Sequence, residues 1–140
     1  MCLAKAQVRE YRELRDSGVQ VSKHNTIKPN AGSETAKHIA LKALVAHVGI
    51  QNSYRVDSEV AINHRGQEVY CDVLLWGHDS RMSCAVEVEH SITPDTVTSK
   101  KEQYVDHTAI DELAVLNATD YPINIQDAYG RVARELGLNV

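Results

Sequence analysis

Two short apolar runs near the middle of the sequence constrain the fold more than any other part of the chain. The runs EVYCDVLLW (68–76) and MSCAVEVEH (82–90) are rich in β-branched residues and are separated by a short polar segment with a glycine, as in a β-hairpin. Side chains alternate between the two faces of a strand, so Glu87 and Glu89 point to the same side. A hairpin can bring Asp72 beside them. The sequence therefore predicts three carboxylates in one patch.

The segment TPDTVTSKKEQYVDHT (93–108) predicts a helix directly after the hairpin, because a threonine N-cap and a proline at the first helical position begin it. Lys101 and Tyr104 fall on the expected inward stripe, whereas Lys100 is expected to point about 100° away from it. An inward lysine has two interpretations. It joins the acidic patch, or its stem extends past Tyr104 and its ammonium group reaches water.

The other segments predict an α/β (α+β) fold in the order α-β-β-β-α-β-α, preceded by an extra N-terminal helix. A helix follows Ser33, its expected N-cap, and places Glu34 in a first turn where the helix dipole favours a carboxylate. The last predicted strand arrives by a helical crossover and should run parallel to its neighbour. We expect an N-terminal helix and loop extension over residues 1–32 and one α/β domain over residues 33–140. The predicted elements are helices over 3–16, 33–48, 93–108 and 127–136 and strands over 54–62, 68–76, 82–90 and 110–117.

Composition indicates an ordinary globular chain. Its 140 residues are 43% hydrophobic and 24% charged, values typical of one domain with a real core. The sequence has no long apolar run and no secretory pattern at its N-terminus, so we expect a cytoplasmic protein without a membrane partner. Its three cysteines form no CxxC pair, and Cys71 and Cys84 are expected to be small buried hydrophobes.

Charge is divided unevenly along the chain. Residues 1–47 hold eight Lys or Arg and four Asp or Glu, a net charge of +4, whereas residues 48–140 hold seven and fifteen, a net charge of −8. The basic third either faces phosphates or consists of solvated helix faces. The amphipathic helix over 3–16 is expected to pack on the domain or to form a homodimer.

Three carboxylates close together need a cation or a proton. At about 6 Å, each pair repels by roughly 3 kcal/mol at an effective dielectric constant of about 20. Oxygen ligands favour Mg2+ or Mn2+, which also bind phosphates. The hypothesis is that Asp72 and Glu87 hold the metal, with Glu89 as a further ligand or as the base for a metal-bound water. The alternative is a sheet surface on which these acids simply face solvent.

The order of elements and the positions of the acids resemble the PD-(D/E)XK nuclease superfamily, which includes restriction endonucleases and Holliday-junction resolvases. The resemblance covers roughly residues 33–117 and implies a restriction endonuclease-like α-β-β-β-α-β core, a central mixed sheet flanked by helices, with the N-terminal and C-terminal helices as additions. It matches Glu34 to the acid of the first helix, Asp72 to the acid of the second strand and Glu87 to the first acid of the third. A lysine usually stands where this chain has Glu89.

Some branches of the superfamily move that lysine to the following helix. The sequence EVEHS followed by KKEQY is similar to replication-relaxation-type proteins of plasmids and viruses, in which an acidic pair precedes a helical Lys-x-x-Tyr, here Lys101 and Tyr104. The resemblance implies a Mg2+- or Mn2+-dependent nuclease acting on DNA rather than RNA, with Lys101 stabilising the transition state and Glu34 orienting a water or a second ion. The alternative function is an inactive nuclease-fold protein that binds nucleic acid in replication or regulation of a mobile element.

Overall fold

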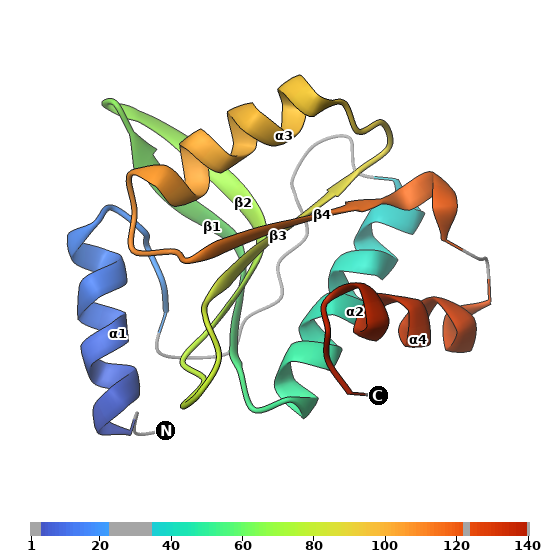
Figure 1. The fold of residues 1–140 in the computed structure, drawn as a ribbon, viewed down its shortest axis with the longest axis horizontal. Helices are drawn as coiled ribbons and strands as arrows, with labels where there is room; N and C mark the ends of the chain where they lie inside the picture. Colours follow the sequence, from blue (N-terminus) through green and yellow to red (C-terminus); the bar gives the residue numbers. More distant parts are fainter. Residues whose placement is uncertain (1–3, 23–34, 122–123, 140) are drawn as a thin grey trace.

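The computed structural model describes residues 4–22, 35–121 and 124–139. In this part the chain is an α+β protein with one four-stranded mixed sheet and four α-helices (Figure 1). A π-helical turn, Glu102–Asp106, continues α3, and a 3-10 turn, Ala118–Asp120, follows β4. The main elements are α1 (Lys5–Asp16), α2 (Ala36–Gln51), β1 (Arg55–His64), β2 (Gln67–Trp76), β3 (Cys84–Glu89), α3 (Pro94–Lys101), β4 (Glu112–Asn117) and α4 (Ile125–Glu135).

The strand order is β1-β2-β3-β4, with antiparallel β1–β2 and β2–β3 pairs and a parallel β3–β4 pair. The predicted meander and the predicted parallel last strand are therefore confirmed. The β1–β2 hairpin turns through only two residues, Arg65 and Gly66, whose φ angles are 50° and 78°. Two consecutive positive φ angles are the geometry of a type I′ turn, whose twist matches that of the flanking strands.

Helices cover both faces of the sheet (Figure 1). One core lies under α2 and α4, and a second core lies under α1 and the turn that follows α3. Apolar residues on alternating positions of the central strands feed the two cores in turn, as expected for strands buried on both faces. The first core includes Leu41, Val45, Val56, Val73, Val86 and Val132, and the second includes Leu14, Val60, Leu74, Trp76, Ala85 and Tyr104.

The regular alternation of side chains between the two cores is interrupted near the middle of the β1–β2 pair, on both strands. Val73 packs in the core under α2 and Cys71 in the core under α3, although residues two apart in a regular strand share a face. Asp72 stands between them, opposite Glu59, whose φ of 49° is unusual for a residue other than glycine. Such irregularities in a strand re-aim its side chains. Here they turn both acids towards α2.

The N-terminal helix packs on the same domain. Leu14 is fully buried, the Tyr11 and Trp76 rings lie 6.2 Å apart, and Gln7 Nε2 donates to the carbonyl of Gly77 at 3.0 Å. The expectation that this helix packs on the domain is confirmed, while homodimer formation and the boundary after residue 32 stay predictions. Cys71 is buried, as predicted.

The start of α2 differs from its prediction. Thr35 is the N-cap of this helix, and its hydroxyl accepts a hydrogen bond from the His38 backbone at 3.1 Å. The predicted cap Ser33 and the candidate acid Glu34 lie outside the described residues. Within the described ranges, no helix has both the length and the apolar character that crossing a membrane requires.

Candidate active site

Two carboxylates stand where the β2–β3 ladder ends. The two strands pair at only three positions, Val73↔Val86, Leu74↔Ala85 and Leu75↔Cys84. One step further, the backbone N–H of Asp72 donates to Glu87 Oε2 at 3.0 Å, and the backbone N–H of Val88 donates to Asp72 Oδ2 at 2.8 Å. Each carboxylate thus accepts a hydrogen bond from a backbone N–H of the opposite strand. In a regular ladder a backbone carbonyl would accept that bond. The predicted proximity of Asp72 and Glu87 is confirmed, and both side chains are fixed by backbone donors.

The helical segment after β3 supplies the partners of Glu87. Its Oε1 lies 2.6 Å from the hydroxyl of Tyr104 and 3.0 Å from Nζ of Lys100. The same hydroxyl lies 2.8 Å from the carbonyl oxygen of Tyr70 on β2, so Tyr104 joins both strands of the site. Glu87 is only 2% exposed. A carboxylate this deeply buried persists because its oxygens have hydrogen-bond donors on both sides.

Burial makes the acids of this site reluctant to ionise. Burial, together with the hydrogen bond to Asp72 and its charge, raises the pKa of Glu87 from 4.5 to about 7. Burial also raises the pKa of Asp72, although hydrogen bonds from its surroundings oppose the rise. Burial lowers the pKa of Lys100, but the negative charges of Glu87 and Glu89 outweigh it and leave that pKa raised. The site therefore combines one firmly charged cation with two carboxyl groups whose pKa values are both raised, that of Glu87 to about 7.

The lysine that reaches the acids is Lys100, and the prediction that Lys101 points inward is wrong. Lys101 is exposed, whereas Lys100 contacts both Glu87 and Glu89. Tyr104 fixes the phase of this helical segment because its side chain is fully buried against the sheet. In a regular α-helix both Lys101 (i−3) and Lys100 (i−4) lie one turn before Tyr104 on nearly the same face. Tyr104 lies in the π-helical turn Glu102–Asp106, which is wider than an α-helical turn. Lys100 therefore shares the face of Tyr104, and its Nζ lies 3.3 Å from the Tyr104 hydroxyl.

Glu89 joins the patch only through that lysine. Its carboxylate lies 3.6 Å from Lys100 Nζ, and its side chain is 29% exposed. Asp72 and Glu87 contact each other directly, whereas Lys100 lies between Glu87 and Glu89. Two of the three predicted acids therefore form one cluster, and Glu89 holds the lysine from the solvent side.

Three residues that the sequence did not single out also border the site. His38 Nε2 lies 3.4 Å from Asp72 Oδ2, and Lys42 Nζ lies 2.5 Å from Glu59 Oε1. Lys42 is 2% exposed although it is charged. A lysine amid the apolar run of α2 was the available signal, because a lysine on a buried helix face needs a partner. The positive φ of Glu59, which helps to aim its side chain at Lys42, leaves no such signal in the sequence.

The donor set can be compared with what a divalent cation needs. Mg2+ commonly keeps several waters and is bound through one or two carboxylates together with substrate phosphates. Asp72 and Glu87 fit that requirement, because their carboxyl groups adjoin, and burial raises the pKa of both. Glu89 does not converge on the same point. Across residues 4–22, 35–121 and 124–139, no three or more His, Cys, Asp or Glu side chains form a ready-made metal cluster.

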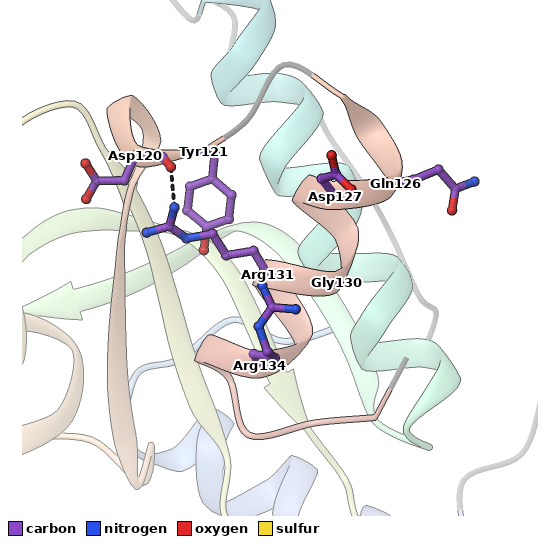
Figure 2. Close-up of a pocket in the computed structure, with 7 residues that line it drawn as sticks. All are labelled: Asp120, Tyr121, Gln126, Asp127, Gly130, Arg131 and Arg134. Atoms are coloured by element: carbon purple, nitrogen blue, oxygen red, sulfur yellow. Dashed lines mark hydrogen bonds between the residues drawn. The ribbon is translucent and has the colours of Figure 1, made fainter.

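A hollow of about 490 Å³ lies elsewhere, along α4 (Figure 2). Arg131 dominates it, but its guanidinium already donates to Glu135 at 3.0 Å and to the carbonyl of Asp120, and it lies over the Tyr121 ring. Its acids and arginines balance each other. The predicted site residues Asp72 and Glu87 do not line this hollow.

Comparison of the chain with protein-family models, with curated proteins and with solved structures found no match.

Proposed function

We propose that this protein is a metal-dependent nuclease with a restriction endonuclease-like core, which hydrolyses DNA phosphodiester bonds at Asp72, Glu87 and Lys100. The observation that carries the proposal is that the adjoining carboxyl groups of Asp72 and the buried Glu87 meet a lysine from the next helix, which contacts Glu87. The order of elements and the mixed sheet support it, because the acids come from the second and third strands of an α-β-β-β-α-β unit.

Asp72 and Glu87 would hold Mg2+ or Mn2+. The bound ion would polarise the phosphodiester and lower the pKa of a water molecule. The protein's own contribution is to fix both carboxylates before the ion arrives, since the Asp72 and Val88 backbone N–H groups hold them in place. Such preorganised groups need little rearrangement during the reaction.

Lys100 would offset the charge that develops on the phosphate. Its ammonium group is within reach of substrate, because its side chain is 26% exposed while Nζ stays 3.0 Å from Glu87. Glu89 stands where the superfamily usually has a lysine, and it contacts the helical lysine instead. The sequence EVE is thus compatible with an active site whose lysine comes from α3. This geometry favours catalysis over the alternative of a protein that only binds nucleic acid.

The test is cleavage of labelled single-stranded, duplex, flap and four-way-junction DNA and of single-stranded RNA, with Mg2+, with Mn2+ and with EDTA. We expect metal-dependent cutting of DNA that Asp72→Asn abolishes and that Lys100→Ala lowers by about 10²- to 10³-fold, the usual effect of losing one transition-state donor. Lys101→Ala is the matched control, because that lysine is adjacent and exposed. Absence of cutting on every substrate, or equal activity of the two lysine variants, contradicts the proposal.

A further inference from the structure

One aromatic side chain is exposed next to the acids. Tyr70 is 52% exposed. The other five tyrosines and the single tryptophan all fall in the described ranges and are buried or half-buried. A lone exposed tyrosine is ordinary on a protein surface, so its meaning depends on its location.

The backbone of Tyr70 is part of the site. Its carbonyl oxygen lies 2.8 Å from the hydroxyl of Tyr104, whose oxygen contacts Glu87. It precedes Asp72 by two residues, which places the two Cα atoms roughly 7 Å apart along β2. The Tyr70 ring therefore lies about one nucleotide's length from a group bound at Asp72.

The ring stands on the face from which α2 approaches Asp72. Its chain neighbours Val69 and Cys71 pack in the core under α3, so the Tyr70 side chain projects to the opposite face. His38, in the first turn of α2, contacts Asp72. The first turn of α2 and the Tyr70 ring thus flank Asp72.

The ring is open on its flank and held at its end. Its partner across the β1–β2 pair is Ala61, whose small side chain cannot cover an aromatic ring. Its hydroxyl donates to the carboxylate of Glu68, on the same strand. An exposed ring with an open flank presents its π-face to solvent.

We propose that Tyr70 stacks on an unpaired base of the substrate, next to the phosphate at Asp72 and Glu87, and that the substrate is single-stranded or carries unpaired nucleotides at the cut. The position of the phosphate rests on the proposed function. A free π-face selects unpaired bases, because base–aromatic stacking works with any base whose own stack is open. Bases inside a duplex already stack on both faces, so the ring adds nothing to duplex binding.

The experiment measures binding without cleavage. A dye-labelled single-stranded DNA 12-mer containing 2-aminopurine and its blunt duplex are titrated with protein in EDTA, by fluorescence anisotropy and by 2-aminopurine emission. We expect Tyr70→Ala to raise the Kd for the single strand by about 5- to 150-fold, the loss of one stacked base, and to leave the duplex Kd unchanged. Tyr70→Phe, which keeps the ring, should bind the single strand as the wild type does, and Tyr129→Ala, on distant α4, is the control.

Equal single-strand affinity of the wild type and Tyr70→Ala, with 2-aminopurine emission that does not depend on the ring, overturns the inference. So does a parallel loss on the duplex, because that is the result of a damaged fold or of a general contact. Failure of the inference and failure of the proposed function are distinguishable. Metal-dependent cutting that is indifferent to Tyr70 retains the nuclease and rejects the stacking, whereas ring-dependent single-strand binding without any cutting rejects the nuclease and retains the stacking.

Discussion

The buried carboxyl of Glu87 should make the stability of the protein fall as pH rises towards neutrality. Its pKa is raised from 4.5 to about 7 by burial and by Asp72, so the folded state holds this proton more tightly than the unfolded state does. Its contribution to stability is fully present below about pH 4.5 and is lost as pH rises through about 7. The shift of about 2.5 units, at about 1.36 kcal/mol per unit, corresponds to a loss of about 3 kcal/mol in the free energy of unfolding.

The assay is urea unfolding at a series of pH values between 4.5 and 8, for the wild type and for Glu87→Gln, in EDTA so that no divalent cation favours the ionised form. Glutamine keeps the shape and cannot ionise. We expect the free energy of unfolding of the wild type, relative to the variant, to fall by about 3 kcal/mol across the window. A difference between the two proteins that stays constant with pH would show that Glu87 titrates normally, and the electrostatic description of the site would be wrong.

Two further predictions concern the surroundings of the acids. Lys42→Met removes one member of the buried pair with Glu59 and should lower the free energy of unfolding by about 3 kcal/mol. This value is at the lower end for a broken buried pair, because Glu59 keeps some exposure. Urea unfolding measures the change, and an effect no larger than that of Lys101→Met contradicts the prediction. Mg2+ at 100 times its Kd should raise the free energy of unfolding by about 2.7 kcal/mol, reversibly with EDTA. The same gain in Asp72→Asn would place the ion elsewhere.

The order of helices and strands was predictable because each element carries its own local signal. Alternating apolar residues predicted the strands, and the threonine N-cap with the proline at the first position of α3 predicted where that helix begins. The proximity of Asp72 and Glu87 followed from the hairpin, since one acid lies on each of its strands. The face that Asp72 takes did not follow from strand alternation, because the alternation of β2 breaks between Cys71 and Val73. The nuclease activity that the resemblance to PD-(D/E)XK nucleases implies is a separate prediction, and the DNA cleavage assay tests it.

The misassigned lysine shows the limit of such rules. Lys100 and Lys101 differ by one residue, or about 100° of helix, and a regular helical stripe selected Lys101. The π-helical turn after α3 shifts the phase, so that Lys100 and not Lys101 reaches the buried Tyr104. Lys42 and Glu59 lie beyond local rules altogether, because their contact joins α2 to an irregular point of β1 that no periodicity marks.

The acidic cluster of Asp72 and Glu87 costs the protein stability at neutral pH, and a bound cation would remove that cost. A buried carboxyl whose pKa is near 7 lowers stability at neutral pH, and an apolar side chain of similar size would avoid that loss. The network of Lys100 and Tyr104 reduces the loss but leaves the pKa of Glu87 raised. A cation at Asp72 and Glu87 would remove it, because ionised carboxylates would then be favoured. Binding of the proposed ion and folding would therefore be coupled at this site, and the stabilisation by Mg2+ should be largest above about pH 7, where the unliganded protein bears the full cost of the charge.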